Sequence, residues 1–261
     1  MGKKLLEIEH VGMYFGGVHA IEDMNMELNE GEILGIIGPN GSGKSTLINV
    51  MTGVYKPTFG RVLFDGRDIT GMQPHKIASL GIARTFQNLR IFTAMTVEEN
   101  VITGSHINIE AGFIDSLLHT KKFRNDEKKA RNKAEELLDF VGLRDMKDAV
   151  SGSMAYGQQK RLEVARALAS EPRVCLFDEP AAGMNSAEAM EMMNVIKKVQ
   201  SERKIGIILI EHNMEAMMNT AQHIVVMNSG SKIAEGTPKE VQSNPLVIQV
   251  YLGEENDAAE N

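Results

Sequence analysis

Four short stretches of the chain are apolar almost without interruption, which is typical of strands buried on both faces of a parallel sheet. They are EILGIIG at 32–38, RVCLFDE at 173–179, IGIILIE at 205–211 and HIVVMN at 223–228. Between them, 125–143 and 187–200 carry apolar residues at helical spacing, with polar residues on the other positions. This alternation of strands and helices predicts an α/β fold with a mainly parallel core sheet.

Two segments follow a different pattern. GRVLFDGRDIT at 60–70 and VVMNSGSKIAEG at 225–236 each place a glycine-containing turn between strand-like pieces, which predicts hairpins. Residues 88 to about 165 show mainly helical patterns, so we expect a helical subdomain inserted there. The main domain is predicted over 1–240, followed at 241–261 by an extension whose acidic end lacks apolar residues and is predicted to be disordered.

Composition limits the possible classes of protein. The chain has 261 residues, of which 43% are hydrophobic and 24% charged, as in ordinary soluble globular proteins. Its net charge of -7 argues against a general nucleic-acid partner. No apolar run approaches the length of a membrane span, and the apolar part of the N-terminus is too short for a secretion signal. The single cysteine, Cys175, fits a reducing compartment, so we expect a cytoplasmic location.

The first predicted strand runs directly into GPNGSGKST, which matches the pattern G-x-x-x-x-G-K-[ST]. Glycines let backbone N–H groups wrap an anion, and the following helix directs its positive end at the same phosphates. Lys44 is predicted to reach the terminal phosphates, and the Ser45 hydroxyl to bind Mg²⁺. The predicted contacts to a nucleoside triphosphate are Gly38, Pro39, Asn40, Gly41, Ser42, Gly43, Lys44, Ser45 and Thr46.

Hydrolysis also needs a metal anchor and a group that activates water. Asp178 and Glu179 end the second predicted strand; Asp178 is predicted to hold Mg²⁺ and Glu179 to polarise the attacking water. His212 ends the third strand and is predicted to bind the terminal phosphate and the water, although such a histidine can also be a cap or a surface group. Gln87 could sense the metal or the water, but composition alone does not distinguish it.

In this order, GPNGSGKST, TFQN, AYGQQKR, CLFDEP and IEH resemble the motifs of the nucleotide-binding subunit of ATP-binding cassette (ABC) transporters. The resemblance covers nearly the whole chain. It implies a P-loop NTPase ABC cassette with an antiparallel β subdomain and an inserted α-helical subdomain, and ATP and Mg²⁺ as cofactors. It also implies that Glu179, His212 and Gln87 act in catalysis, with Ser45, Gln87 and Asp178 at the metal. Phe15 matches the aromatic residue that stacks on adenine; a core aromatic is the alternative.

The stretch MAYGQQ at 154–159 matches the signature motif of that family in part. The resemblance implies that Tyr156, Gly157 and Gln158 face the γ-phosphate bound to an opposite cassette. Ala155 lacks the hydroxyl that is usual at its position, and Asn185 stands where many members have aspartate. These departures leave the predicted hydrolytic centre intact and concern the contact between two cassettes.

The segments EPAAGMN and NPLVIQVYLGEE look like those of importers for branched-chain amino acids and related small polar solutes. This resemblance implies membrane permease subunits and a second cassette, identical or related, as partners. It also implies an indirect link to a solute-binding protein and a peripheral place on the inner face of the cell membrane. Two alternatives stay open: a soluble ABC ATPase, for example in cofactor assembly, and a module that binds nucleotide without hydrolysing it.

Overall fold

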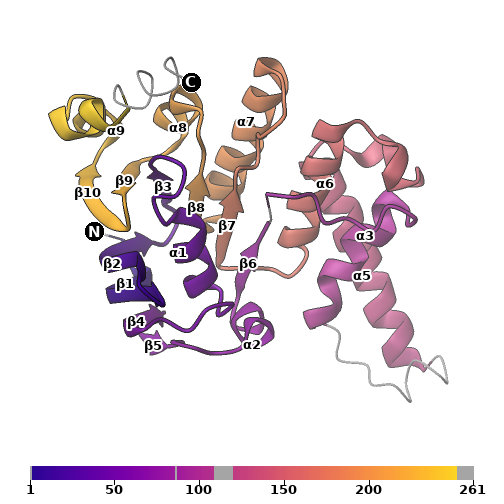
Figure 1. Ribbon diagram of the computed structural model, residues 1–261. Helices are drawn as coiled ribbons and strands as arrows, with labels where there is room; N and C mark the ends of the chain where they lie inside the picture. The colour runs from indigo at the N-terminus through magenta and orange to yellow at the C-terminus, as the bar shows by residue number, and fades with distance from the viewer. Residues whose placement is uncertain (1, 86, 109–119, 252–261) are drawn as a thin grey trace.

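The computed structural model describes residues 2–85, 87–108 and 120–251, which form two sheets with helices packed around them (Figure 1). The predicted acidic tail lies outside these residues. Among the described helices, none has both the length and the apolar character needed to pass through a bilayer.

The larger sheet contains the four strands predicted from apolar runs. Its order is β10-β9-β3-β8-β7-β6, and neighbouring strands from β9 to β6 are parallel. β9 and β10 pair antiparallel, which confirms the hairpin predicted at 225–236. The bounds are β3 (Ile33–Ile37), β6 (Ile82–Arg84), β7 (Val174–Asp178), β8 (Gly206–Ile210), β9 (His223–Asn228) and β10 (Ser231–Gly236).

The smaller sheet is antiparallel, in the order β2-β1-β4-β5. Its strands are β1 (Lys4–Phe15), β2 (Val18–Asn29), β4 (Phe59–Phe64) and β5 (Arg67–Asp68), the last two being the hairpin predicted at 60–70. The apolar pattern did not predict β1 and β2, because register shifts interrupt their alternation. One shift surrounds His10, whose backbone is left-handed with φ 49°.

The helices are α1 (Lys44–Met51), α2 (Pro74–Ser79), α3 (Val97–Gly104), α5 (Lys121–Phe140), α6 (Tyr156–Leu168), α7 (Ser186–Arg203), α8 (Met214–Thr220) and α9 (Pro238–Gln242). Both ends of α5 lie earlier than the predicted helix at 125–143. The Thr120 hydroxyl caps its start by accepting the N–H of Phe123 at 3.4 Å. Just after its end, Gly142 takes the left-handed conformation, φ 71°, that commonly stops a helix.

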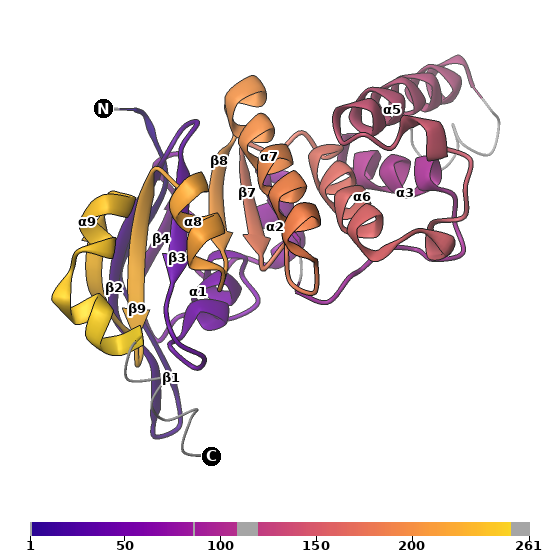
Figure 2. The same cartoon turned by 90° about the horizontal axis from the view of Figure 1, so that it is seen from above.

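Helices α3, α5 and α6 pack on one another at one end of the molecule, beyond β6 and β7 (Figures 1 and 2). In the same views α1 lies on the opposite side of β7 from α6. This grouping supports a helical subdomain inserted between β6 and β7. Its boundaries at 88 and about 165 stay a prediction.

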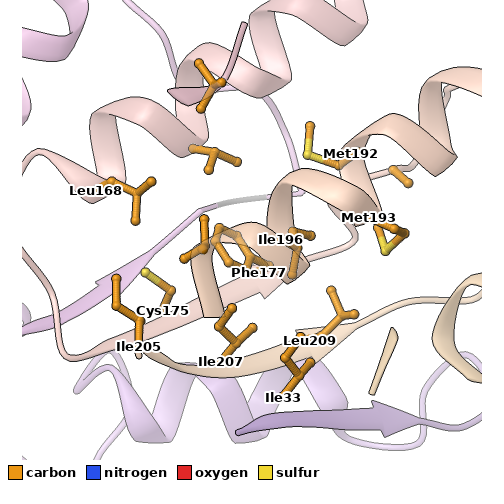
Figure 3. Packing of buried hydrophobic residues seen from close by; sticks show 14 of the residues in the cluster. Ile33, Leu168, Cys175, Phe177, Met192, Met193, Ile196, Ile205, Ile207 and Leu209 are labelled. Atoms are coloured by element: carbon orange, nitrogen blue, oxygen red, sulfur yellow. The ribbon is translucent and has the colours of Figure 1, made fainter. Parts of the chain in front are cut away.

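The central strands of the larger sheet, β3, β7 and β8, are buried on both faces, as the continuous apolar runs predicted. Within β3, Ile33 and Ile37 belong to one apolar cluster, and Leu34 and Ile36 to another on the opposite face. Figure 3 shows the first cluster, in which side chains from β7 and β8 pack against α7. Cys175 lies in this cluster, and burial raises the pKa of its thiol to about 12, so its role is packing.

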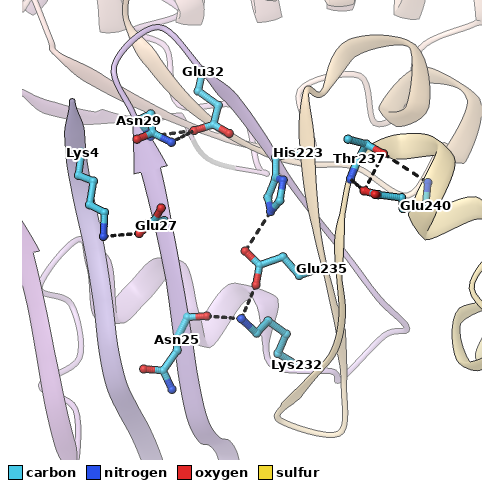
Figure 4. A network of polar contacts seen from close by, with 10 residues as sticks. All are labelled: Lys4, Asn25, Glu27, Asn29, Glu32, His223, Lys232, Glu235, Thr237 and Glu240. Carbon is cyan, nitrogen blue, oxygen red and sulfur yellow. Dashed lines mark hydrogen bonds and ion pairs between the residues drawn. The ribbon is translucent and has the colours of Figure 1, made fainter. Parts of the chain in front are cut away.

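Polar contacts join the smaller sheet to the edge of the larger one (Figure 4). Lys232 on β10 donates from Nζ to the carbonyl of Asn25 on β2 at 2.7 Å, and it also pairs with Glu235. Glu235 in turn accepts from Nε2 of His223 on β9 when that nitrogen is protonated, at 3.0 Å. The joint fixes the sheet that carries Phe15 against the sheet that carries the glycine-rich loop.

Candidate active site

The glycine-rich loop leaves β3 and enters α1 at a place where side chains do not fit. A Cβ atom on Gly38 would lie 2.1 Å from the carbonyl oxygen of Met227, and one on Gly43 would lie 2.4 Å from that of Ala20. Both glycines also have positive φ, 151° and 101°. The loop is therefore pressed against β9 and β2.

Lys44 supplies the charge of this loop. Its Nζ donates to the carbonyl oxygens of Gly38 and Pro39, at 2.6 and 2.7 Å, so the ammonium group lies against the loop itself. The N-cap residue Gly43 offers no side-chain acceptor, and the first turn of α1 carries no acidic residue. The positive end of α1 and the ammonium group together favour binding of phosphate.

The three side chains predicted to act in catalysis lie together, just beyond the carboxyl ends of the neighbouring strands β7, β8 and β6. Oε2 of Glu179 accepts a hydrogen bond from Nε2 of Gln87 at 2.8 Å. Oε1 of Glu179 lies 2.7 Å from Nε2 of His212, which donates when that nitrogen carries the proton. The Glu179 side chain is 14% exposed, so its carboxylate is held in one orientation at the rim of the sheet.

The backbone at Glu179 is left-handed, with φ 51°. For a residue with a Cβ atom this conformation costs on the order of 1 to 3 kcal/mol and persists only where the surroundings impose it. Here the N–H of Glu179 donates to the carbonyl of Ile210 at 3.0 Å, and its carbonyl accepts from Ala182 at 3.1 Å. The turn directs the side chain of Glu179 towards Gln87 and His212.

Glu211 is a buried carboxylate that the sequence analysis did not single out. Its Oε1 accepts the N–H of Ala181 at 2.8 Å, in the turn that follows Glu179. Burial raises the pKa of Glu211 above its usual value, and the charge of Glu179 raises it further, against the lowering effect of the Ala181 bond. Glu211 therefore ties β8 to the turn that positions Glu179. The sequence feature that could have identified Glu211 is its position directly after the apolar run at 205–210.

Asp178, predicted to hold the metal, forms a buried ion pair with Arg84. Nη2 of Arg84 lies 3.0 Å from Oδ2 of Asp178, and the two side chains are 11% and 7% exposed. Nη1 of Arg84 also donates to Oδ1 of Asn49 on α1, at 2.7 Å. Sequence reasoning missed Arg84, although a charged residue in the apolar piece GIARTF was a signal.

The described residues contain no group of three histidine, cysteine, aspartate or glutamate side chains that could enclose a metal ion. Magnesium bound with a nucleotide needs no such group, because phosphate oxygens, a hydroxyl and water supply most of its ligands. Ser45 lies in the first turn of α1, Asp178 is the last residue of β7, and Gln87 follows β6 at the same edge of the sheet. Their oxygen donors fit Mg²⁺.

The signature residues lie apart from the glycine-rich loop of the same chain. Gly157 and Gln158 are in the first turn of α6, which lies across β7 from α1. Tyr156 lies beside Gly183, where an added Cβ atom would be 3.4 Å from its ring. The start of α6 therefore packs near the loop that follows Glu179, and it does not join the phosphate loop of its own chain.

Phe15 ends β1 and is 43% exposed, with its ring edge-on to Tyr55 at a centroid distance of 5.3 Å. This exposure argues against the alternative that Phe15 is a core aromatic. Its stacking on adenine stays a prediction.

A glycine-rich phosphate loop after a central parallel strand, with an oriented carboxylate at the end of a nearby strand, defines a P-loop nucleoside triphosphatase. The chain belongs to the ABC transporter family, because residues 21–182 match the family described as "ABC transporter". Residues 231–257 match a second description, "Branched-chain amino acid ATP-binding cassette transporter". The predicted fold class is confirmed, and the chain is a nucleotide-binding ATPase of a transport system.

Relatives that match nearly the full length of this chain are named as transport proteins. "High-affinity branched-chain amino acid transport ATP-binding protein BraF" of Pseudomonas aeruginosa is 42% identical over 254 residues, 97% of this chain and 100% of the relative. LivG of Escherichia coli, described in the same words, is 39% identical with the same coverage. These relatives support the predicted transport subunit over the soluble ATPase and the non-hydrolysing module.

Solved structures agree with this assignment. The ADP conformation of an ATP-binding cassette of an ABC transporter has a TM-score of 0.83 and 36% identity, covering 96% of this chain and 99% of that one. A nucleotide-free cassette from an ABC transporter has a TM-score of 0.81 and 36% identity, covering 95% and 98%. A dimeric cassette bound to ADP and Pi is 24% identical, with a TM-score of 0.75 and coverage of 90% and 99%, and shares the fold.

Phe15 and Lys44 are expected to act on different parts of the nucleotide. Phe15→Ala removes a surface for the base, so it should weaken ATP and adenosine alike, by about 1 to 3 kcal/mol. Lys44→Ala removes a charged hydrogen bond to phosphate, worth about 1.5 to 3 kcal/mol, and should weaken ATP while leaving adenosine nearly unchanged. Calorimetric titration with both ligands measures the difference. Unchanged ATP affinity in Phe15→Ala would remove Phe15 from the site.

Substitutions of Glu211 should separate its hydrogen bond from its charge. Because its folded pKa is raised, Glu211 holds its proton longer in the folded chain than in the unfolded chain. Its contribution to the free energy of unfolding is therefore full below the unfolded pKa and declines as pH rises through the folded pKa. Glu211→Gln keeps the acceptor without the charge, so the melting temperature of this variant relative to that of the unchanged chain should rise as pH increases above about 4.5, the ordinary glutamate pKa.

Glu211→Ala is the matched variant, because it leaves the buried N–H of Ala181 without its acceptor. It should lower the free energy of unfolding by about 1 to 3 kcal/mol at each pH tested. If Glu211→Gln were as destabilised as Glu211→Ala at neutral pH, the ionised carboxylate itself would be needed to hold the turn.

Proposed function

We propose that this chain drives an importer for branched-chain amino acids or a related small polar solute, as one of two cassettes that associate on binding ATP. The names of the relatives BraF and LivG support the solute class, and so does the match over 231–257. The chain then lies in the cytoplasm on the inner face of the cell membrane, bound to permease subunits. A solute-binding protein acts with it only indirectly, through those subunits.

The observation that carries the hydrolytic role is the orientation of Glu179 by two side chains at the end of β7. A carboxylate fixed in this way can accept a proton from water as the water attacks the γ-phosphorus, with ADP as the leaving group. Gln87 and His212 contact the same carboxylate, so a neutral amide and an imidazole would lie beside that water. His212 can then turn from Glu179 to the terminal phosphate, while Lys44 neutralises charge on the phosphates.

Mg²⁺ bound with ATP would be held by Ser45, Asp178 and Gln87, directly or through water. It would supply positive charge that offsets the negative charge of the phosphates. Arg84 holds the side chain of Asp178 in place and balances its charge, since a buried carboxylate is costly without such a partner.

Two chains face to face would complete each site. The start of α6 lies across β7 from the phosphate loop of its own chain, so Tyr156, Gly157 and Gln158 can reach a nucleotide only on a second cassette. A helix start without acidic residues suits a γ-phosphate there. The second cassette is an identical chain or a related one.

A groove near Phe92 suits a loop of the permease. The cavity, of about 540 Å³, lies between β6, α3 and α6 and is lined by Arg84, Phe92, Glu163 and Arg166 among others. Asn100 fixes the backbone of Phe92 through hydrogen bonds of 2.8 and 3.1 Å to its N–H and carbonyl, and Phe92 remains 50% exposed. Met95, 37% exposed, continues the same segment. The groove thus offers apolar contacts from Phe92 and basic contacts from Arg166 and from Arg84, which pairs with Asp178.

Glu179→Gln tests the proposed activity in the assembled transporter. The amide cannot take a proton, so ATP turnover should fall by about two decades or more, while ATP affinity stays within about threefold. Uptake of labelled leucine by cells or vesicles with the complete transporter should stop with it. Turnover close to that of the unchanged chain would remove Glu179 from the role of base. Leucine uptake that does not depend on this chain would contradict the solute class instead.

Crosslinking tests the permease groove. A cysteine at Phe92 or Met95 should crosslink to permease loops in membranes that contain the complete transporter. Met190, exposed on α7 away from the groove, is the matched position and should not crosslink. The native Cys175 is buried and will not interfere. Crosslinks at Met190 and none at Phe92 or Met95 would place the permease elsewhere.

A further inference from the structure

Lys160 is a lysine in the interior of the protein. It lies on α6 and is 2% exposed. With Val164 and Leu168 it occupies positions four residues apart, so it belongs to the buried face of the helix. Lysine is almost never buried to this extent unless its charge is paired. The burial of Lys160 therefore needs an explanation, which its contacts supply.

The contacts of Lys160 reach the segment that carries Gln87. Its Nζ donates to the backbone carbonyl of Gln87 at 2.8 Å. The carboxylate of Glu163, 3.7 Å away and equally buried, balances the charge within the same helix. Glu163 also accepts the N–H of Arg90 at 3.4 Å, so the pair holds the segment at two points.

Two hydrogen bonds in series therefore connect α6 to the carboxylate of Glu179. The first runs from Lys160 to the carbonyl of Gln87, and the second from the amide of Gln87 to Oε2 of Glu179, each at 2.8 Å. Gly157 precedes Lys160 by about one helical turn, so the start of α6 moves with it. A shift of α6 must then either break the first bond or displace Gln87.

We propose that Lys160 is a positioning residue that sets the place of Gln87, and through it of Glu179, according to the position of α6. The proposal rests on the catalytic roles proposed above for those two residues. A nucleotide held at the start of α6, or a partner in the groove that Glu163 lines, moves the same helix. Binding of either one therefore changes the position of the Glu179 carboxylate through the hydrogen bond between Lys160 and Gln87.

The test uses a charge-neutral replacement, Lys160→Gln with Glu163→Gln, because removing Lys160 alone would also take away a positive charge that balances the buried carboxylate of Glu163. In the purified full chain, kcat for ATP hydrolysis should fall about tenfold or more while KM stays within about threefold. The matched control is Lys147→Gln, which removes a 2.6 Å ion pair with Glu135 at the same end of the molecule without reaching Gln87. It should leave both constants unchanged.

The decisive measurement repeats the replacement in a Gln87→Ala background. If Lys160 acts through Gln87, the replacement should then lower kcat by less than about twofold. The same loss of kcat in both backgrounds would overturn the role of Lys160 and leave that of Gln87 standing. If Gln87→Ala alone had normal kcat, the proposed role of Gln87 would be wrong. The proposed role of Lys160, which acts through Gln87, would then be wrong as well.

Lys160→Arg covers the case in which the neutral replacement does not fold. It keeps the buried charge and a hydrogen-bond donor, so kcat should stay within about threefold of the unchanged chain. A loss as large as that of Gln87→Ala, at an unchanged melting temperature, would overturn the proposal.

Discussion

Burial of β3, β7 and β8 on both faces is the constraint that decides where this chain can do chemistry. A polar side chain within these strands would lie in one of the two apolar clusters, so functional groups can appear only where the strands end. Because the strands are parallel, their carboxyl ends meet at one edge of the sheet. The phosphate loop, Glu179 and His212 follow those ends, and their assembly is a consequence of strand direction.

The same constraint explains what the sequence could predict. Continuous apolar runs locate the central strands, and the residues just past each run are candidates for the site. Glu179 and His212 lie together because those runs are neighbours in the sheet, whereas Gln87 follows β6, a strand next to β7 that was not among the predicted runs. β1 and β2 could not be found in the same way, since the bulge at His10 interrupts their alternation of apolar and polar residues. The apolar pattern of a sequence does not show where such register shifts occur.

The charged residues that hold the site in place were not predictable. Arg84 meets Asp178 across 94 positions of sequence, and Lys160 meets Gln87 across 73. Each is a charge on a buried element, which is costly until folding supplies its partner. The sequence shows the charge within an apolar pattern, but the identity of the partner depends on how β6, β7 and α6 pack. Such residues are therefore signals of a buried polar contact, whose function follows only from tertiary structure.

The two departures from the family pattern differ in their local effect. Asn185 caps α7 by accepting the N–H of Glu188 at 3.0 Å, and aspartate would cap it similarly, so this departure removes a charge and keeps the helix start. Ala155 has no side-chain acceptor, and Gln158 instead accepts the N–H of Ala155 at 3.1 Å. The donors in the first turn of α6 therefore lack a capping side chain of their own. In the proposed pair of cassettes, an anion brought by the second cassette would satisfy them, so we expect the association of two cassettes to depend on bound ATP.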